Sequence, residues 1–267
     1  MILDGKKLRD ELLISYKEKI SKDNLSITLA IILVGDDEAS KLYIKNKEKY
    51  CSMVGINVIK YLLPKETSEE ELISLIKSLN EKEEVTGIIL QSPVPSNINF
   101  DKCSGLINEN KDVDGFTKDN VYNLYLNKKG ILPCTVKGII RLLDSYNILL
   151  SGKDVVIIGR GNIVGKPLAM ALENRNATVS LLHSKTTKNA DIVVSACGVP
   201  KLIKSNMIKQ GAVVIDVGIS RTDTGIIGDV DFESVKDVAS YVTPNPGGVG
   251  PMTVAMIIDN LIEMSEV

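Results

Sequence analysis

Tyr43 and Lys47 are four residues apart in a segment with helical spacing, so they project from the same helix face, one turn apart. Lys41, Lys45 and Lys49 share this segment, and a run of lysines is usually a solvated basic face. The chemical alternative is an aromatic platform beside an amine. Burial lowers the pKa of a lysine amine toward neutrality, which suits proton transfer. The spacing therefore predicts either a solvated surface or an acid/base group.

Gln91 and the segment Lys111-Asp112-Val113-Asp114-Gly115 supply further polar groups. Gln91 either caps a loop or holds an amine through an uncharged hydrogen bond. Two carboxylates followed by glycine usually form a turn. Further oxygen ligands at regular spacing are missing, so we expect no metal site here. A carboxylate can also accept two parallel hydrogen bonds from amidine-like N–H groups of a ligand.

A glycine-rich turn from Gly159 to Gly165 indicates a nucleotide site. It follows the β-branched run Val155 to Ile158 and precedes a segment with helical character. Glycine permits positive φ and close approach of the backbone to phosphates, and the N–H groups of the helix start face an anion. The spacing G-x-G-x-x-x-G is one residue longer than the common dinucleotide fingerprint. The strand, turn and helix around it favour a dinucleotide.

The residues after the next expected strand indicate which dinucleotide is bound. NAD sites usually place an Asp or Glu there to hold the ribose hydroxyl. This strand, Ala177 to Leu182, is instead followed by His183-Ser184-Lys185-Thr186. Arg160, Ser184 and Lys185 offer donors to a 2′-phosphate, which favours NADP over NAD. His183 is equally consistent with a half-buried side chain and with a cofactor contact.

The loop from Pro244 to Pro251 is rich in proline and glycine. Such a stretch is stiff and carries few side chains to keep its backbone away from a flat ligand. It predicts a ligand-binding loop or a stiff interdomain hinge, and both can hold.

Alternating helices and apolar strands must position these groups. In the first part of the chain, helices are expected after Asp4, from Glu38 to Val54 with Gly55 at its end, and after Ser68. The strands expected between and after them are Ile27 to Val34, Ile56 to Leu63 and Gly87 to Leu90. This pattern predicts a parallel sheet covered on both faces, with ligands at the carboxyl ends of the strands, where Gly35 and Gln91 lie.

The second part of the chain repeats this alternation in a compact form. Asn108 to Pro133 is the best candidate for a crossing between domains, and Thr135 is expected to cap a helix. The expected strands are Val155 to Ile158, Ala177 to Leu182, Ala190 to Ala196, Ala212 to Val217 and a short one near Ser240 to Val242. A helix from Met252 to Met264, with Pro251 at its first turn, follows them.

The composition favours a small-molecule ligand. The 267 residues favour two domains over one large α/β domain, and a net charge of -2 gives no sign of a nucleic-acid or membrane partner. The cysteines (Cys51, Cys103, Cys134, Cys197) lack C-x-x-C spacing, and the single histidine leaves little for zinc. We expect free thiols in a reducing cytoplasm, and a soluble protein because no apolar run approaches ~20 residues.

Taken together, these segments resemble the bifunctional methylenetetrahydrofolate dehydrogenase/methenyltetrahydrofolate cyclohydrolase family. They occur in the family's order and cover nearly the whole chain. The matching segments are Ser40 to Lys47 with Gly55-Ile56, Gln91-Ser92-Pro93, Lys111 to Gly115, Pro133-Cys134-Thr135, Gly159-Arg160 with Val164 to Pro167, His183 to Thr186, and Thr243 to Thr253.

The resemblance implies an α/β fold of two domains. An N-terminal αβα substrate domain, residues 1–118, would be completed by the C-terminal helix, residues 252–267. A Rossmann-type domain, residues 135–250, would bind NADP. The implied partners are tetrahydrofolate derivatives and a second copy of the chain in a homodimer.

The resemblance also implies roles for single residues. Lys47 would be the general acid/base group, Tyr43 would pack on the folate, Gln91 would support the lysine, and Asp114 would anchor the pterin. A hydride would pass from the methylene carbon to NADP⁺, and water would then add to the methenyl cation to give formyltetrahydrofolate. The other implied substrate contacts are Pro93, Pro246, Gly247, Gly248 and Pro251. The implied cofactor contacts are Gly159, Arg160, Gly161, Asn162, Ile163, Val164, Gly165, His183, Ser184, Thr186, Cys197, Gly198 and Ile219.

Three departures from the family pattern concern the second domain. Gly161 stands where serine is common, Val136 stands where proline is usual, and the segment between Thr186 and Ala190 is short, which predicts a trimmed or missing helix. Two alternatives stay open. One is an NADP-dependent oxidoreductase acting on another carbonyl or imine, and the other is a non-catalytic nucleotide sensor.

Overall fold

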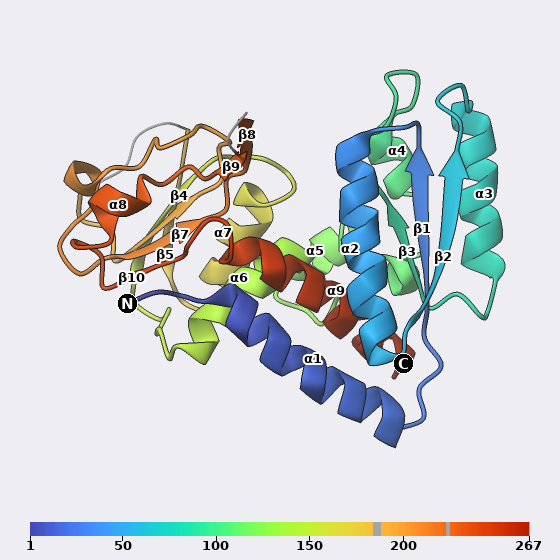
Figure 1. The fold of residues 1–267 in the computed structure, drawn as a ribbon, viewed down its shortest axis with the longest axis horizontal. Helices are drawn as coiled ribbons and strands as arrows, with labels where there is room; N and C mark the ends of the chain where they lie inside the picture. Colours follow the sequence, from blue (N-terminus) through green and yellow to red (C-terminus); the bar gives the residue numbers. More distant parts are fainter. Residues whose placement is uncertain (184–187, 223–224, 267) are drawn as a thin grey trace. The chain divides into compact units, whose positions relative to one another are not determined.

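The computed structural model describes residues 1–183, 188–222 and 225–266, which form two compact units (Figure 1). Unit 1 consists of Met1–Asp10, Leu124–Lys128 and Thr135–Thr253, and unit 2 of Glu11–Asn123, Lys129–Cys134 and Val254–Val267. The boundaries fall after Lys128 and within four helices, α1 (Gly5–Lys22), α5 (Lys118–Tyr125), α6 (Cys134–Ser145) and α9 (Val249–Ser265). Each unit contains its own parallel sheet, so the expected two-domain α/β fold is confirmed.

The sheet of unit 2 has three parallel strands in the order β2-β1-β3. These strands are β1 (Thr28–Val34), β2 (Asn57–Leu63) and β3 (Gly87–Leu90). All residues of β1 are buried, as expected for the central strand of a sheet covered on both faces. Strands β2 and β3 pair with opposite edges of β1, so the chain changes direction across the sheet at β1. The carboxyl end of β1 is therefore a topological switch point.

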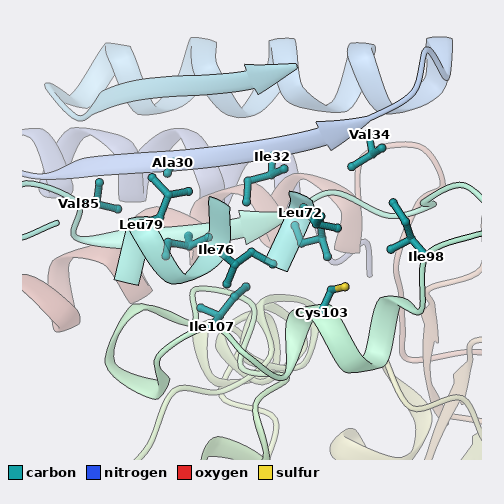
Figure 2. Close-up of a cluster of buried hydrophobic side chains, with 12 residues drawn as sticks. Ala30, Ile32, Val34, Leu72, Ile76, Leu79, Val85, Ile98, Cys103 and Ile107 are labelled. Atoms are coloured by element: carbon teal, nitrogen blue, oxygen red, sulfur yellow. The ribbon is translucent and has the colours of Figure 1, made fainter. Parts of the chain in front are cut away.

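Helices α3 (Glu69–Glu81) and α4 (Phe100–Ser104) cover one face of this sheet. Figure 2 shows Ala30, Ile32 and Val34 of β1 facing Leu72, Ile76 and Leu79 of α3, with Ile98, Cys103 and Ile107 beyond them. Helix α2 (Glu38–Val54) packs against β2. The C-terminal part of α9 packs against β3, where a Cβ added to Gly87 would lie 2.6 Å from Leu261.

The helix ends follow the capping residues in the sequence. Asp4 accepts a hydrogen bond from the Lys7 N–H at 2.9 Å just before α1. Ser68 and Glu71 form a capping box at the start of α3. Gly55 ends α2 with φ of +94°. These three predictions are confirmed.

The segment expected to cross between domains contains a 3₁₀ turn, η1 (Glu109–Lys111), and helix α5 (Lys118–Tyr125). Asp112, between them, makes a parallel bridge to Ile88 and so continues the sheet beyond β3. Neither α4 nor α5 is expected from the sequence, because short segments rich in Asn, Asp and Lys carry a weak helical pattern.

The sheet of unit 1 has five parallel strands in the order β10-β7-β6-β4-β5. The strands are β4 (Asp154–Ile158), β5 (Thr178–Leu182), β6 (Ile192–Ser195), β7 (Val213–Asp216) and β10 (Tyr241–Val242). Helix α7 (Gly165–Glu173) connects β4 to β5, and the chain then returns to the other side of β4. Among the described residues between β5 and β6, none is helical, in line with the shortened segment.

The remaining elements of unit 1 are short, apart from α6 (Cys134–Ser145). Because α6 begins at Cys134, the prediction that Thr135 caps it is wrong. The Thr135 hydroxyl lies in the first turn and shares a 3.2 Å hydrogen bond with Thr253. The unpredicted elements are η2 (Ser205–Met207), the antiparallel pair β8 (Ser220–Thr222) and β9 (Gly225–Ile227), and α8 (Phe232–Val235).

The four cysteines are free, as predicted. No helix within the described ranges is long and apolar enough to cross a membrane.

Candidate active site

Lys47 differs from the other lysines of α2 in its burial. Lys41, Lys45 and Lys49 are exposed, and Lys41 pairs with acidic residues beside it. The solvated-face interpretation therefore holds for these three. Lys47 is only 9% exposed and lies on the same helix side as Ile44. The Lys47 side chain therefore lies on the buried side of α2, the helix that packs against β2.

Gln91 holds the Lys47 amine. Lys47 Nζ donates a hydrogen bond to Gln91 Oε1 at 3.0 Å. The Gln91 backbone N–H donates to Ile32 O, which fixes the residue at the end of β3, and Gln91 Nε2 donates to Ser92 O at 2.7 Å. The acceptor is the oxygen of a neutral amide, so it orients the amine without placing a second charge against it.

Asp114 lies within electrostatic reach of Lys47. The bridge between Ile88 and Asp112 aligns this segment with β3 and carries Asp114 toward the strand's carboxyl end. Burial raises the pKa of the Asp114 carboxyl, the Lys47 charge opposes this rise, and the Asp112 charge adds to it. The structure thus brings Lys47, Gln91 and Asp114 together at the switch point of unit 2.

Asp112 supports the turn that presents Asp114. Its buried carboxylate accepts hydrogen bonds from the Thr117 N–H at 2.7 Å and from Asn120 Nδ2 at 3.0 Å. The turn interpretation of this segment is correct, since the Gly115 N–H donates to Asp112 O at 3.2 Å and Asp114 lies within the turn.

Asn260 of α9 holds the backbone next to Asp114, and sequence analysis missed it. Its buried Nδ2 donates to Val113 O at 2.9 Å and to Leu132 O at 3.0 Å. A polar residue within the apolar segment Ala255 to Ile262 is the signal that could have identified it, because a buried amide needs partners.

We expect Asn260→Leu to destabilise the chain by about 2–5 kcal/mol, because two buried carbonyl groups each lose a hydrogen-bond donor while the branched shape of the side chain is roughly kept. The shift of the urea unfolding midpoint measures this. Asn46 is exposed on α2, so Asn46→Leu should change stability by less than about 0.5 kcal/mol. Equal midpoints for the two variants would contradict the role of Asn260.

Tyr43 lies one turn before Lys47 on α2 and is 42% exposed, so its ring is accessible to a ligand.

The peptide bond between Ser92 and Pro93 is cis. The Ser92 carbonyl that precedes it accepts from Gln91 and from Ser40 Oγ at 3.5 Å. Ser40 therefore helps to position the Ser92 carbonyl beside Gln91. It belongs to one of the segments that match the family, but it is not among the site residues predicted from the sequence.

Cys51 is one turn beyond Lys47 but is not a nucleophile. It is fully buried, and burial raises the pKa of its thiol to about 12, against the effect of the Lys47 charge. The thiol therefore stays protonated at neutral pH.

In unit 1, two of the three glycines in the predicted turn are required by the backbone. Gly159 has φ of +112°, and a Cβ there would lie 2.3 Å from Ala196 O. A Cβ on Gly165 would lie 2.0 Å from Gly159 O. At Gly161 φ is not in the left-handed region and no atom lies within 4 Å of an added Cβ, so neither packing nor conformation requires glycine there.

The N-terminus of α7 has the form of an anion site. Val164 precedes the helix and provides no side-chain cap. The residues before it, Arg160, Asn162 and Ile163, are exposed, and Asn162 Oδ1 accepts from Lys166 Nζ at 2.9 Å. The Lys166 N–H donates to Gly161 O at 3.1 Å, so the glycine turn itself covers part of the helix start. A glycine turn followed by a helix start is the usual place for the phosphates of a dinucleotide.

The other predicted cofactor residues lie at the strand ends around this turn. Cys197 follows β6, and its Sγ lies 3.6 Å from Ile158 O, while Gly198 O accepts from Ser220 Oγ at 3.1 Å. Ile219 is exposed. His183 is also exposed, so the half-buried interpretation is wrong. Ser184, Lys185 and Thr186 lie outside the described residues.

The loop before α9 is held by the start of α1. The Lys6 N–H donates to Gly247 O at 2.9 Å, and a Cβ on Gly248 would lie 2.6 Å from Pro244 O. Pro246 follows a cis peptide, and Pro251 is in the first turn of α9, as predicted. The loop is closely packed on its own backbone.

No group of three or more His, Cys, Asp or Glu side chains in the described part of the chain is arranged to hold a metal ion.

Comparisons with known proteins cover both units. Residues 3–114 match the family model of the tetrahydrofolate dehydrogenase/cyclohydrolase catalytic domain, and residues 133–267 match that of its NAD(P)-binding domain. The bifunctional protein FolD of Campylobacter hominis is 48% identical, over 99% of this chain and 97% of that protein.

Solved structures give the same result. The bifunctional methylenetetrahydrofolate dehydrogenase/cyclohydrolase FolD of Campylobacter jejuni superposes with a TM-score of 0.97 and 45% identity, over 100% of this chain and 98% of that chain. The Trypanosoma brucei enzyme, solved with NADP and an inhibitor, has a TM-score of 0.94 and 33% identity, over 100% and 97% of the two chains.

Proposed function

Because the chain belongs to the tetrahydrofolate dehydrogenase/cyclohydrolase family, we propose that Lys47, Gln91 and Asp114 carry its folate chemistry. The protein oxidises 5,10-methylenetetrahydrofolate to 5,10-methenyltetrahydrofolate with NADP⁺ and hydrolyses the product to 10-formyltetrahydrofolate. An oxidoreductase acting on another carbonyl or imine is not favoured, since the catalytic domain as well as the nucleotide domain matches this family.

The observation that carries the residue assignment is the one buried lysine in a helix of exposed lysines. The Lys47 amine donates a hydrogen bond to the neutral side chain of Gln91 and interacts electrostatically with the Asp114 carboxyl group. In the hydrolysis, the Lys47 amine would exchange protons with the attacking water and with the folate nitrogen that is released. Tyr43, one turn away, would pack on the pterin, and Asp114 would accept hydrogen bonds from its amidine-like N–H groups.

The cofactor fits the turn in unit 1. Gly159 and Gly165 let the backbone turn tightly into the start of α7, no side-chain cap precedes that helix, and Gly161 adds no side chain, so phosphates would bind along this turn. NADP⁺ supplies the hydride acceptor when bound. Arg160 would hold the 2′-phosphate together with Ser184, and the strand-end residues Cys197, Gly198 and Ile219 would line the rest of the site.

Other parts of this proposal rest on the family resemblance. They are the folate contacts of Pro93, Pro246, Gly247, Gly248 and Pro251, the cofactor contacts of His183 and Thr186, and the division into a substrate domain (1–118 with 252–267) and an NADP domain (135–250). A homodimer in a reducing cytoplasm is also proposed. Sedimentation equilibrium tests the dimer, since a mass of 29.1 kDa in solution would contradict it.

NADP⁺ should be preferred over NAD⁺, and Arg160→Ala should remove most of this preference. We expect the KM for NADP⁺ to rise about 10- to 100-fold, as for the loss of a hydrogen bond to a charged group, while the KM for NAD⁺ stays unchanged. Both are measured from reduced cofactor formed with methylenetetrahydrofolate, after chromatographic separation from the folate.

The matched control is Arg175→Ala, which removes an exposed arginine of the same unit that pairs with Asp144. It should leave both constants unchanged. A wild-type preference for NAD⁺, or an unchanged preference in Arg160→Ala, would overturn the assignment of the 2′-phosphate site.

A further inference from the structure

Asp229 lies in unit 1, outside every predicted site. Its side chain is fully buried. Oδ2 accepts hydrogen bonds from Ser195 Oγ at 3.0 Å, from the Cys197 N–H at 2.8 Å and from the Gly198 N–H at 3.2 Å. Oδ1 accepts from the Val199 N–H at 2.8 Å. One carboxylate therefore binds four of the five residues in the turn from Ser195 to Val199.

This turn is at the switch point of the five-stranded sheet. It follows β6, whose neighbour β4 ends in the glycine turn. The two turns are in contact, because an added Cβ on Gly159 would lie 2.3 Å from Ala196 O. In parallel sheets, ligands bind at the carboxyl ends of the strands beside such a point.

A second buried carboxylate fixes Asp229 itself. Asp216 Oδ1 accepts from the Asp229 N–H at 2.9 Å, and Asp216 Oδ2 accepts from the Val230 N–H at 3.2 Å. The Asp216 N–H in turn donates to Thr243 Oγ1 at 2.7 Å. The absence of a side chain at Gly218 allows its backbone to lie against the Asp229 side chain, since a Cβ there would be 2.0 Å from the Asp229 carboxyl group.

We infer that Asp229 is a positioning residue for NADP⁺, which holds the Ser195–Val199 turn in the shape that receives the cofactor. This inference rests on the proposed function of the turn in unit 1. Three donors share Oδ2 and one binds Oδ1, so the turn cannot relax without losing several hydrogen bonds at once. Lys47, Gln91 and Asp114, the groups proposed for the hydrolysis, belong to unit 2, so we expect Asp229 to affect cofactor affinity and not the chemistry of the hydrolysis.

Asp229→Asn is nearly isosteric but turns an amide N–H₂ toward N–H donors. We expect the KM for NADP⁺ and its Kd in calorimetry to rise about 10- to 100-fold, as for one or two lost hydrogen bonds to a charged acceptor. The cyclohydrolase kcat/KM should stay within about twofold, because that reaction uses water and no cofactor. Asp231→Asn is the control, since Asp231 precedes α8 without making a side-chain cap.

Ser195→Ala is a milder variant that removes one donor and keeps the three backbone N–H groups. If Asp229→Asn does not fold, a smaller rise of the KM for NADP⁺ in Ser195→Ala, with unchanged cyclohydrolase, supports the inference. An unchanged Kd for NADP⁺ in folded Asp229→Asn, or in Ser195→Ala where the first variant fails, overturns it. Wild-type protein that binds NADP⁺ but turns over no folate would instead refute the proposed function.

Discussion

Lys47→Met should reduce both the dehydrogenase and the cyclohydrolase kcat/KM by about 10²- to 10⁴-fold, the usual contribution of a general acid/base group. Methionine keeps the length and apolar stem of the buried side chain but removes the amine that donates to Gln91. Initial rates of both reactions, measured on the same preparation, test this result.

Lys45→Met is the matched control, because Lys45 is an exposed lysine of the same helix. It should leave both rates unchanged. NADP⁺ affinity in calorimetry should also be the same in wild type and in both variants, since the cofactor residues belong to unit 1. Full retention of either activity in Lys47→Met would refute the role of Lys47 in that reaction.

Asp114→Asn should lower kcat/KM for both folate reactions by about 10²- to 10⁴-fold, as for the loss of two hydrogen bonds to a charged acceptor. The amide replaces one acceptor oxygen with a donor, which would oppose the N–H groups of the pterin. Asp101→Asn changes an exposed carboxylate of the same unit and serves as the control. A variant with unchanged KM for folate would exclude Asp114 as the pterin anchor.

The same carboxyl group should make folate binding depend on pH. Burial raises the pKa of Asp114, so its proton is taken up at a higher pH than by an exposed aspartate, although the Lys47 charge opposes the shift. Protonation removes the negative charge that accepts the pterin hydrogen bonds. As pH falls through this pKa, the KM for folate should therefore rise in wild type, and Asp114→Asn should lack this rise.

The central strands and their capped helices could be predicted because their signals are local. The continuous apolar run of β1 identifies a strand buried on both faces, and Ser68 with Glu71 marks a helix start. Helix α5 and the β8 and β9 pair could not be predicted, since short, half-exposed segments depend on tertiary contacts more than on periodicity.

The same distinction applies to the site. Tyr43 and Lys47 are related by helical spacing, and Gln91 by its position after an apolar strand, so sequence reasoning can find them. Asn260 supports a carbonyl 147 positions away, and Asp229 accepts from groups about 30 positions before it. A single sequence contains no periodic pattern for such contacts.

The division of α9 between the units ties the folding of unit 2 to a late stage of synthesis. The ribosome makes β3 and the Asp114 segment long before α9, which supplies Leu261 beside Gly87 and the amide of Asn260. A nascent chain that has not reached α9 leaves one face of β3 uncovered. Domains encoded one after the other can fold in that order during synthesis. Unit 2 cannot, because its last segment is synthesised only after the strands of unit 1.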